Sequence, residues 1–212
     1  KGLINDPHLN NTYALNDGLR MARKLLSDIN DLTVPTAGEF LDMITPQYLA
    51  DFMSWGAIGA RTTESQVHRE LASGLSCAVG FKNATNGGVK IALDAIGAAE
   101  APHHFLSVTK FGHSAIVSTK GNEDCHIILR GGDNGPNYSE QDVANVCDEL
   151  TKAGYRAHVM VDFIHANSCK QFKKQLDVSR EVARQIAAGS DKIFGVMIES
   201  HLVEGRQDLV EG

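Results

Sequence analysis

Short apolar runs alternate with segments of helical periodicity along most of the chain. In the first such segment, apolar side chains recur at Leu19, Ala22, Leu26 and Ile29, which predicts a helix over residues 16–30. Apolar runs predict strands at residues 36–41, 57–61, 78–82, 104–108, 158–162 and 193–199. Strands that alternate with helices imply a parallel sheet with right-handed crossovers, and almost wholly apolar strands imply that both sheet faces are covered.

Capping residues, prolines and glycines mark the ends of the predicted helices. Thr45 resembles an N-cap and Pro46 a first helical residue, and the helix that they begin is predicted to end near Trp55 and Gly56. Further helices are predicted over about residues 65–74, 89–99, 139–154, where the start has a capping-box pattern, and 170–188.

The alternation of strands and helices breaks after residue 108. Residues 115–118 and 126–130 flank Gly121 and Asn122, a pair that predicts a small β-hairpin. With the hairpin taken as an insert, about six strand-helix units remain. A closed (β/α)8 TIM barrel needs eight units and typically about 250 residues. The pattern therefore predicts most of such a barrel. A doubly wound sheet is the rival fold, although no G-x-G-x-x-G follows the first strand.

Composition limits the class of protein further. The chain has 212 residues, 42% of them hydrophobic, which fits one domain with a substantial core. Its formal net charge of -6 argues against a nucleic-acid-coating protein, and no apolar run is long enough to span a membrane. Cys77, Cys125, Cys147 and Cys169 include no CxxC pair, so they are expected to be reduced thiols of a cytoplasmic protein. A start at Lys1 in place of Met favours a piece of a longer chain.

Polar and charged side chains stand at the ends of the predicted strands, where a barrel collects its active site. Arg61, Lys82 and Arg130 come from different units and would converge on one mouth, where three cations suit a phosphate and a carboxylate. The alternative is that each cation pairs with a structural carboxylate. The full set at the strand ends is Glu39, Asp42, Arg61, Lys82, Thr109, Lys110, Arg130, Asp162, His165, Glu199 and His201.

An imidazole and a carboxylate end the last two strands. His165 and Glu199 together suit Mn, Fe, Zn or Co, but two ligands do not make a metal site, and ordinary hydrogen-bonded residues explain them as well. Asp162 is expected to orient a neighbour, pair with one or only cap its strand. Cys169 has no base partner beyond His165, so a passive thiol is favoured over a nucleophile.

Six stretches carry a resemblance when taken together and in order: residues 37–42 (AGEFLD), 59–65 (GARTTES), 80–83 (GFKN), 128–132 (ILRGG), 165–168 (HANS) and 199–201 (ESH). The chain resembles the type I 3-deoxy-D-arabino-heptulosonate 7-phosphate (DAHP) synthases over essentially its whole length. The resemblance implies an internal fragment: residues 1–212 as a single catalytic barrel domain, incomplete at both ends, with the first two strands and the last helix missing. It also implies a metal-dependent transferase that condenses phosphoenolpyruvate with erythrose 4-phosphate and water, giving DAHP and phosphate in the shikimate pathway to aromatic amino acids.

The resemblance assigns roles by position. It implies a phosphoenolpyruvate site at Ala60, Arg61, Lys82 and Arg130, catalytic roles for Lys82, Arg130 and His165, and two of four metal ligands at His165 and Glu199. The other two family ligands, a Cys and an Asp, and the loop that binds erythrose 4-phosphate have no match here. The chain also departs from the family at Ile164, where Ser is usual, at Ala84, where Gly is usual, and at Ala78, where Pro is usual.

Feedback inhibition and assembly are further implications of the resemblance. Ser107 looks like the phenylalanine-sensitive form, since tyrosine-sensitive members often carry Gly there. The matching effector pocket comprises Asp42, Met43, Pro46, Gln47, Leu71, Leu75, Phe105 and Ser107, although the apolar members also suit a core. A homo-oligomer, often a dimer or tetramer, is expected.

Three other functions stay open at this point. One is another phosphoenolpyruvate-condensing barrel, such as a 3-deoxy-D-manno-octulosonate 8-phosphate synthase. A second is a Schiff-base aldolase that uses Lys82 or Lys110. The third is an inactive fragment that serves only as a binding or assembly module, because an open barrel exposes sheet edges and the isolated piece is expected to be unstable or inactive.

Overall fold

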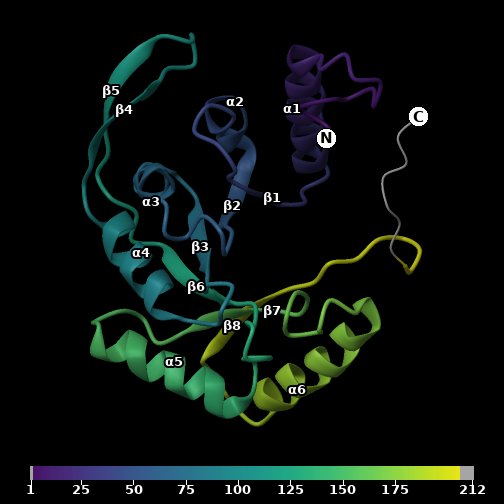
Figure 1. Ribbon diagram of the computed structural model, residues 1–212, viewed down its shortest axis with the longest axis vertical. Helices are drawn as coiled ribbons and strands as arrows, with labels where there is room; N and C mark the ends of the chain where they lie inside the picture. The colour runs from purple at the N-terminus through teal and green to yellow at the C-terminus, as the bar shows by residue number, and fades with distance from the viewer. Residues whose placement is uncertain (1, 206–212) are drawn as a thin grey trace.

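A computed structural model describes residues 2–205 of the chain. Its main sheet has six parallel strands that neighbour one another in chain order and curve into an incomplete barrel (Figure 1). The predicted parallel sheet is therefore confirmed, and the doubly wound rival is wrong, because that fold requires a strand order that reverses at a switch point. The six strands are β1 (Thr36–Glu39), β2 (Met53–Ile58), β3 (Ala78–Lys82), β6 (Cys125–Leu129), β7 (Val159–Asp162) and β8 (Ile193–Met197).

Helices connect successive strands and cover the outer face of the sheet (Figure 1). The capping box predicted at the start of one helix is confirmed, since Ser139 and Asp142 each bind the other's backbone amide. No helix among the described residues has the length and apolar character needed to cross a membrane. The helices are α1 (Leu15–Asp31), α2 (Pro46–Leu49), α3 (Gln66–Ala72), α4 (Lys90–Glu100), α5 (Glu140–Lys152) and α6 (Gln175–Ala187), with 3-10 turns at Ala50–Phe52 and Phe172–Lys174.

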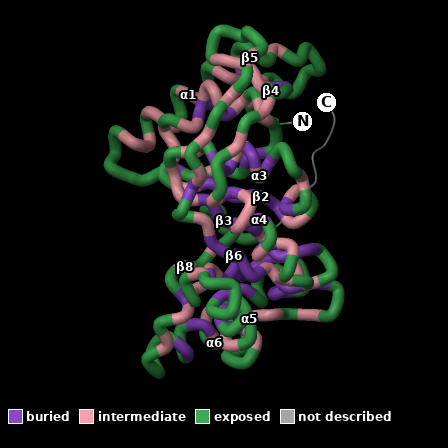
Figure 2. The backbone as a smooth tube through the Cα atoms, turned by 90° about the vertical axis from the view of Figure 1, so that its left-hand side faces the viewer, coloured by how far each residue is buried: buried purple, intermediate pink, exposed green. Residues whose placement is uncertain are grey.

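The main hydrophobic core lies between the central strands and the helices that cover them. Alternate residues such as Val79 and Phe81 on β3 are buried in this core. Because successive residues of a strand face opposite sides of the sheet, Lys82 lies on the other face. Figure 2 shows the buried residues concentrated along β3 and β6 and in the layer beneath them. The strands are thus held firmly by their outer faces, which fixes the positions of the side chains at their ends.

The hairpin prediction was wrong in its strands. β4 (His104–Val108) pairs with β5 (Ser114–Ser118) in an antiparallel hairpin, whereas residues 126–130 belong mostly to β6 in the main sheet. The difference in burial between β5 and β6 explains why β6, and not β4 or β5, belongs to the main sheet. Exposed and partly buried residues alternate along β5, while Ile127 and its neighbours on β6 are fully buried, as in a central parallel strand. The number of barrel strands was right, but β6 replaces the segment 104–108 among them.

The helix predicted to run from Thr45 to Gly56 is also shorter than expected. It ends at Leu49, and β2 already begins at Met53. Gly56 does not terminate a helix: it lies within β2, where a Cβ atom would overlap the ring of Phe40. The Thr45 side chain does not cap the helix, because its hydroxyl donates to Asp42, whose carboxylate also accepts the backbone amides of Ile44 and Thr45.

Candidate active site

The carboxyl ends of β3, β6, β7 and β8 bring charged side chains to one edge of the sheet. Lys82 is the last residue of β3, Arg130 directly follows β6, and Asp162 ends β7. His165 lies three residues beyond β7, and Glu199 two residues beyond β8. Because the strands are parallel and in register, these ends form a common rim, which is the position of the active site in barrel enzymes.

A buried carboxylate organises this rim. Lys82 Nζ donates to Asp162 Oδ2 at 2.8 Å and lies 3.0 Å from His165 Nε2, while Asp162 Oδ2 is 3.4 Å from the same ring nitrogen. The Asp162 side chain is 1% exposed, and its other oxygen accepts the amide of Ile164. Of the three possibilities that the sequence left open for Asp162, the structure supports pairing, and the pairing joins two predicted site residues.

His165 occupies a strained and electrostatically unusual position. Its φ of 54° lies in the left-handed region, which residues other than glycine rarely adopt, and such strain concentrates at functional sites. Burial lowers the pKa of His165, the positive charges of Lys82 and Arg130 lower it further, and the carboxylates of Asp162 and Glu199 oppose them. The lowered pKa favours the neutral imidazole, the form in which histidine binds a metal ion.

The residues present fit one part of a metal site. His165 Nε2 and Glu199 Oε1 are 3.7 Å apart. One ion about 2.0–2.2 Å from each donor would accept that separation. Among residues 2–205, no cluster of three or more His, Cys, Asp and Glu side chains is arranged to hold a metal. His165 and Glu199, which the resemblance implied as ligands, thus lie close enough together to share one ion.

The three predicted anion-binding cations differ in their surroundings. Lys82 has a structural carboxylate partner in Asp162, as the alternative interpretation required. Arg61 and Arg130 form no ion pair with any carboxylate of the described chain, and within that chain the guanidinium of Arg130 donates one long bond, to the carbonyl of Gly131. Arginines without carboxylate partners at a strand-end rim suit an external anion.

Arg61 and Ala60 lie on a tight turn after β2. The carbonyl of Gly59 accepts the amides of Thr62 and Thr63, and the Thr63 hydroxyl donates to the backbone carbonyl of Lys82 at 2.8 Å. This bond ties the turn that carries Ala60 and the exposed Arg61 to the end of β3. The turn therefore belongs to the same rim as Lys82.

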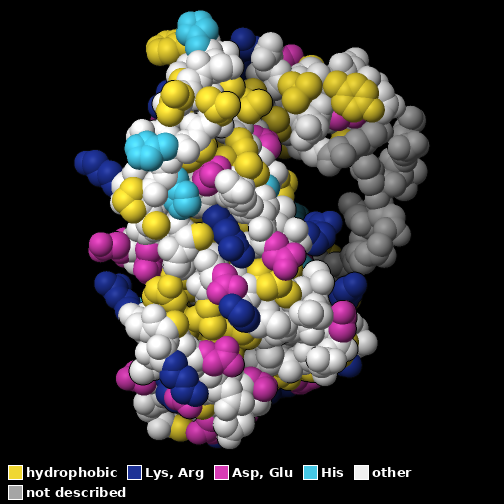
Figure 3. Space-filling view, turned by 60° about the vertical axis from the view of Figure 1, so that its left-hand side comes forward, with side chains coloured by type: hydrophobic (Ala, Val, Ile, Leu, Met, Phe, Trp, Pro, Cys, Tyr) yellow, Lys and Arg dark blue, Asp and Glu magenta, His cyan; other side chains and the backbone are white. Residues whose placement is uncertain are grey.

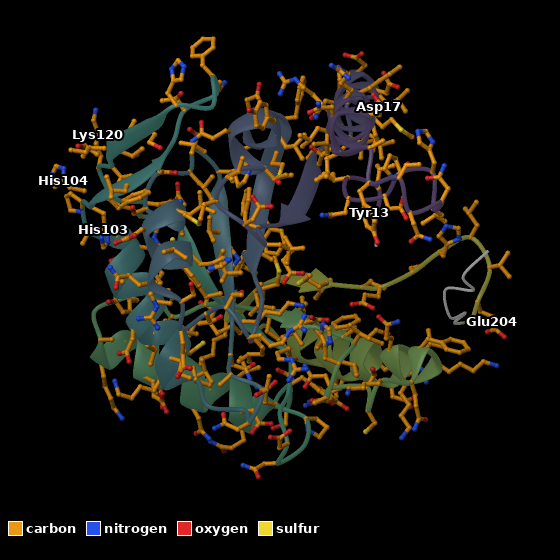
Figure 4. All side chains as sticks on the ribbon, turned by 45° about the horizontal axis from the view of Figure 1, so that its top comes forward. Tyr13, Asp17, His103, His104, Lys120 and Glu204 are labelled. Carbon is orange, nitrogen blue, oxygen red and sulfur yellow. The ribbon has the colours of Figure 1, made fainter. Side chains whose placement is uncertain are left out.

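A cavity away from the rim brings together most of the residues predicted to bind an effector. It has a volume of about 750 Å³ and lies between the segment that contains α2, the end of α3 and the hairpin. Asp42 does not line it, because its carboxylate is engaged with the turn at residues 44–45. Lys120, which follows β5 and is labelled in Figure 4, also borders the cavity. The predicted residues that line it are Met43, Pro46, Gln47, Leu71, Leu75, Phe105 and Ser107.

Two further features complete the picture of the predicted residues. A cavity of about 700 Å³ adjoins His165 and Glu199 and is lined in part by Lys170 and His201.

At the opposite ends of the strands, Trp55 donates to the buried His126, and burial lowers the pKa of His126 to about 4. His126 is therefore a core histidine.

The fold and the rim define a (β/α)-barrel protein whose functional groups gather at the carboxyl ends of the strands. Comparison with known families is more specific: the model of the DAHP synthetase I family matches residues 1–212. The chain belongs to that family. The family expected from the six stretches of sequence is thereby confirmed.

Individual relatives agree with this assignment. The chain is 83% identical over 212 residues to a phospho-2-dehydro-3-deoxyheptonate aldolase of Haemophilus influenzae and 72% identical to the Phe-sensitive enzyme of that name from Escherichia coli K12. It covers 59% and 60% of the length of these proteins, so it spans well under two thirds of each. The structure of the enzyme of the same name from Francisella tularensis SCHU S4 is 56% identical in sequence and matches with a TM-score of 0.95. The match covers the whole of this chain and 63% of that structure. The likeness confirms that the six parallel strands are part of a TIM barrel.

Proposed function

We propose that the full-length protein condenses phosphoenolpyruvate with erythrose 4-phosphate to form DAHP and phosphate. The observation that carries the proposal is the rim cluster of Lys82, Asp162 and His165, with Arg130 and Glu199 beside it. Membership of the DAHP synthetase I family and the names of the two relatives support the same reaction. The chain spans about 60% of the length of those relatives, so the activity is proposed for the full-length protein.

Each rim residue has a task in this reaction. The C3 carbon of phosphoenolpyruvate bonds to the aldehyde carbon, water adds to C2, and the C2–O bond breaks as phosphate leaves. Arg61, Lys82 and Arg130, with Ala60 beside them, would hold the carboxylate and phosphate of phosphoenolpyruvate and stabilise the charge that moves between them. Asp162 would keep Lys82 oriented towards the rim.

His165 and Glu199 would supply two ligands to a divalent ion, with Mn, Fe, Zn and Co as the chemically suitable choices. When bound, such an ion provides Lewis acidity at the aldehyde oxygen. His165 suits this role because its lowered pKa favours the neutral ring, and its Nε2 lies 3.7 Å from Glu199 Oε1.

An assay of the full-length protein with both substrates tests the function. DAHP should form, and EDTA should stop its formation until metal is restored. Formation of an octulosonate product with arabinose 5-phosphate in place of erythrose 4-phosphate would support the related synthase instead. A product trapped on Lys82 or Lys110 by borohydride would support the Schiff-base aldolase, and no product with any aldose would leave a binding or assembly module.

Replacing Arg61 with Ala is expected to weaken phosphoenolpyruvate binding by about a hundredfold, because one bidentate partner of an anionic group is lost. Steady-state kinetics with varied phosphoenolpyruvate would measure the change. Arg20, which is exposed and pairs with Asp17 on α1, is the matched control, and Arg20→Ala should leave the kinetics as in the parent protein. An unchanged Michaelis constant and turnover in Arg61→Ala would remove Arg61 from the substrate site.

We further propose that phenylalanine inhibits the protein by binding in the cavity between α3 and the hairpin. The gathering of Leu71, Phe105, Ser107 and other predicted residues around one cavity supports this site. The relative from Escherichia coli K12 is named Phe-sensitive, whereas others that are 56% identical are named Trp-sensitive. The higher identity to the former favours phenylalanine.

In an inhibition assay, phenylalanine is expected to act at a lower concentration than tyrosine or tryptophan. Ser107→Phe should abolish that inhibition, because the added ring fills the cavity that Ser107 lines. Ser114→Phe is the matched control, since Ser114 is exposed at the other strand of the hairpin and does not line the cavity. Tyrosine acting far more strongly than phenylalanine would contradict the assignment.

We also propose a homo-oligomer, a dimer or a tetramer. Hydrophobic side chains gather at the hairpin end of the molecule (Figure 3), and Leu106, Phe111 and Ile116 on the hairpin are each at least 75% exposed. Exposed apolar groups of this kind favour contact with another protein surface. Sedimentation equilibrium of the full-length protein would give the number of subunits, and a monomer at micromolar concentration would contradict the proposal.

A further inference from the structure

Three asparagines lie directly behind the cationic rim. Asn83 follows Lys82, Asn137 lies in the loop after β6, and Asn167 lies two residues beyond His165. Asn83 is 0% exposed and Asn167 is 3% exposed, and Asn137 is half-buried. Each of the loops that carries a predicted site residue on these strands therefore contributes one buried or half-buried carboxamide.

Asn83 uses all four of its hydrogen-bonding positions. Its Oδ1 accepts the backbone amide of Arg130 at 2.9 Å and Nδ2 of Asn137 at 3.2 Å. Its Nδ2 donates to the carbonyls of Ala84 at 2.9 Å and Gly131 at 3.1 Å. A carboxamide offers two donors and two acceptor sites, so no other side chain of this size could make the same four bonds.

Asn137 and Asn167 extend the network to the next loop. Asn137 Oδ1 accepts the backbone amide of Gly131 at 2.7 Å, and the backbone amide of Asn137 donates to Asn167 Oδ1 at 2.9 Å. Asn167 Nδ2 donates to the carbonyls of Leu129 at 3.1 Å and Asp162 at 2.7 Å. The ends of β3, β6 and β7 are thus joined through side chains, beyond the point where the strand ladders stop.

The network converges on the peptide unit that carries Arg130. The amide of Arg130 is held by Asn83, its carbonyl by the amides of Ala166 and Asn167, and the next amide, at Gly131, by Asn137. Gly131 has a φ of 73°, and a Cβ atom there would lie 2.8 Å from the amide of Asn167. The chain therefore turns sharply just after Arg130 and is fixed on every side.

We propose that Asn83, Asn137 and Asn167 are positioning residues that set the direction of Arg130 relative to Lys82, and so the spacing of the two cations that receive phosphoenolpyruvate. The inference rests on the proposed function. None of the three asparagines need touch substrate, because each acts through the backbone on which Arg130 stands. An error of about 1 Å in such a position can lower the rate by a factor of about a hundred.

The alternative is that the three asparagines only stabilise the fold, as we expect of the buried Asn122. Asn122 is also buried, and its Nδ2 donates to the carbonyls of Ala72, Leu75 and Cys77. It stands before β6, at the end of the sheet away from the rim. Loss of its side chain should lower stability without any effect on substrate binding, which makes it the matched control.

The test compares Asn137→Ala with Asn122→Ala in the full-length protein. Asn137→Ala is expected to raise the KM for phosphoenolpyruvate about tenfold or more and to leave the KM for erythrose 4-phosphate within about twofold. Calorimetric titration with phosphoenolpyruvate alone should show the same loss of affinity. Asn122→Ala should lower the melting temperature and leave both KM values unchanged. Asn137→Asp keeps the acceptor for the Gly131 amide but replaces the donor to Asn83 with a negatively charged acceptor, so it should also raise the KM for phosphoenolpyruvate.

Each outcome decides a separate question. A parent protein that forms DAHP, with Asn137→Ala and Asn137→Asp that bind phosphoenolpyruvate as well as the parent, would overturn the positioning role alone. An equal effect of both Asn137 variants on the two substrates would also overturn it, because that result indicates general loosening of the barrel. A parent protein that neither binds phosphoenolpyruvate nor forms DAHP would overturn the proposed function, and the positioning role with it. If Asn137→Ala fails to fold, the kinetics of Asn137→Asp decide.

Discussion

Lys82→Met is expected to lower kcat/KM about a thousandfold or more, because it removes a fixed positive charge from the rim where charge moves during the reaction. The same change should lower the free energy of unfolding by about 3–5 kcal/mol, since it leaves the Asp162 carboxylate buried without its cation. Steady-state kinetics and thermal unfolding of the full-length protein measure the two effects.

A double variant separates these two consequences. Lys82→Met combined with Asp162→Asn removes both charges and keeps the shape of the carboxyl group, so most of the lost stability should return. Activity should stay low, because the cation is still missing. A double variant no more stable than Lys82→Met would show that the carboxylate is solvated after all. Recovery of activity in the double variant would remove Lys82 from catalysis.

Lys90 is the matched control for this experiment. It lies at the start of α4, its side chain is exposed, and it pairs with Asp94 one helical turn away. Such surface pairs contribute well under about 1 kcal/mol, so Lys90→Met should change neither stability nor kinetics measurably. An effect of Lys90→Met comparable with that of Lys82→Met would indicate that net charge, and not position, is responsible.

Phe81→Ala is expected to cost about 3–5 kcal/mol of unfolding free energy and to lower the melting temperature by about 10 °C. Phe81 is 0% exposed, belongs to the main core, and lies one residue before Lys82 on β3. Removal of its ring leaves a cavity that the surrounding strands and helices fill only in part. Calorimetry of the full-length protein gives both quantities.

Phe111 offers the same side chain in the opposite environment. It stands between the two strands of the hairpin and is 86% exposed. Measured at a protein concentration low enough to dissociate any subunits, Phe111→Ala should change the unfolding free energy by less than about 0.5 kcal/mol. If Phe81→Ala is no more destabilising than Phe111→Ala, the core does not lie where the structure places it.

Most of the barrel could be predicted from the sequence, because strands covered on both faces carry apolar runs that are visible in the chain. β3 and β4 were predicted with the bounds that the structure shows. Pairing was harder to predict. Residues 104–108 form an apolar run like that of β3, and only the exposure along β4 and β5 separates a projecting hairpin from a barrel strand. A glycine within a strand was equally misleading, since Gly56 accommodates Phe40 and ends nothing.

The candidate site divides in the same way. Lys82, Arg130, His165 and Glu199 stand at strand ends, and parallel topology alone brings such residues to one rim. The partner of Lys82 could not be read from the chain, because Asp162 is 80 positions away and a strand-end Asp has several ordinary roles. The asparagine network was missed for the same reason: Asn83 and Asn137 are 54 positions apart.

The hairpin also bears on how the family can diversify. β4 and β5 bond only to each other in the described sheets, and neither carries a rim residue. The hairpin projects from the barrel (Figure 1), yet Phe105, Ser107 and Val117 on its strands line the cavity proposed for the effector. Under the proposed function, substitutions around this cavity would change which amino acid is sensed, while selection on the chemistry would keep the strand ends constant. A barrel of this design could then be duplicated within one genome and retuned to a different end product by a few substitutions remote from the reaction.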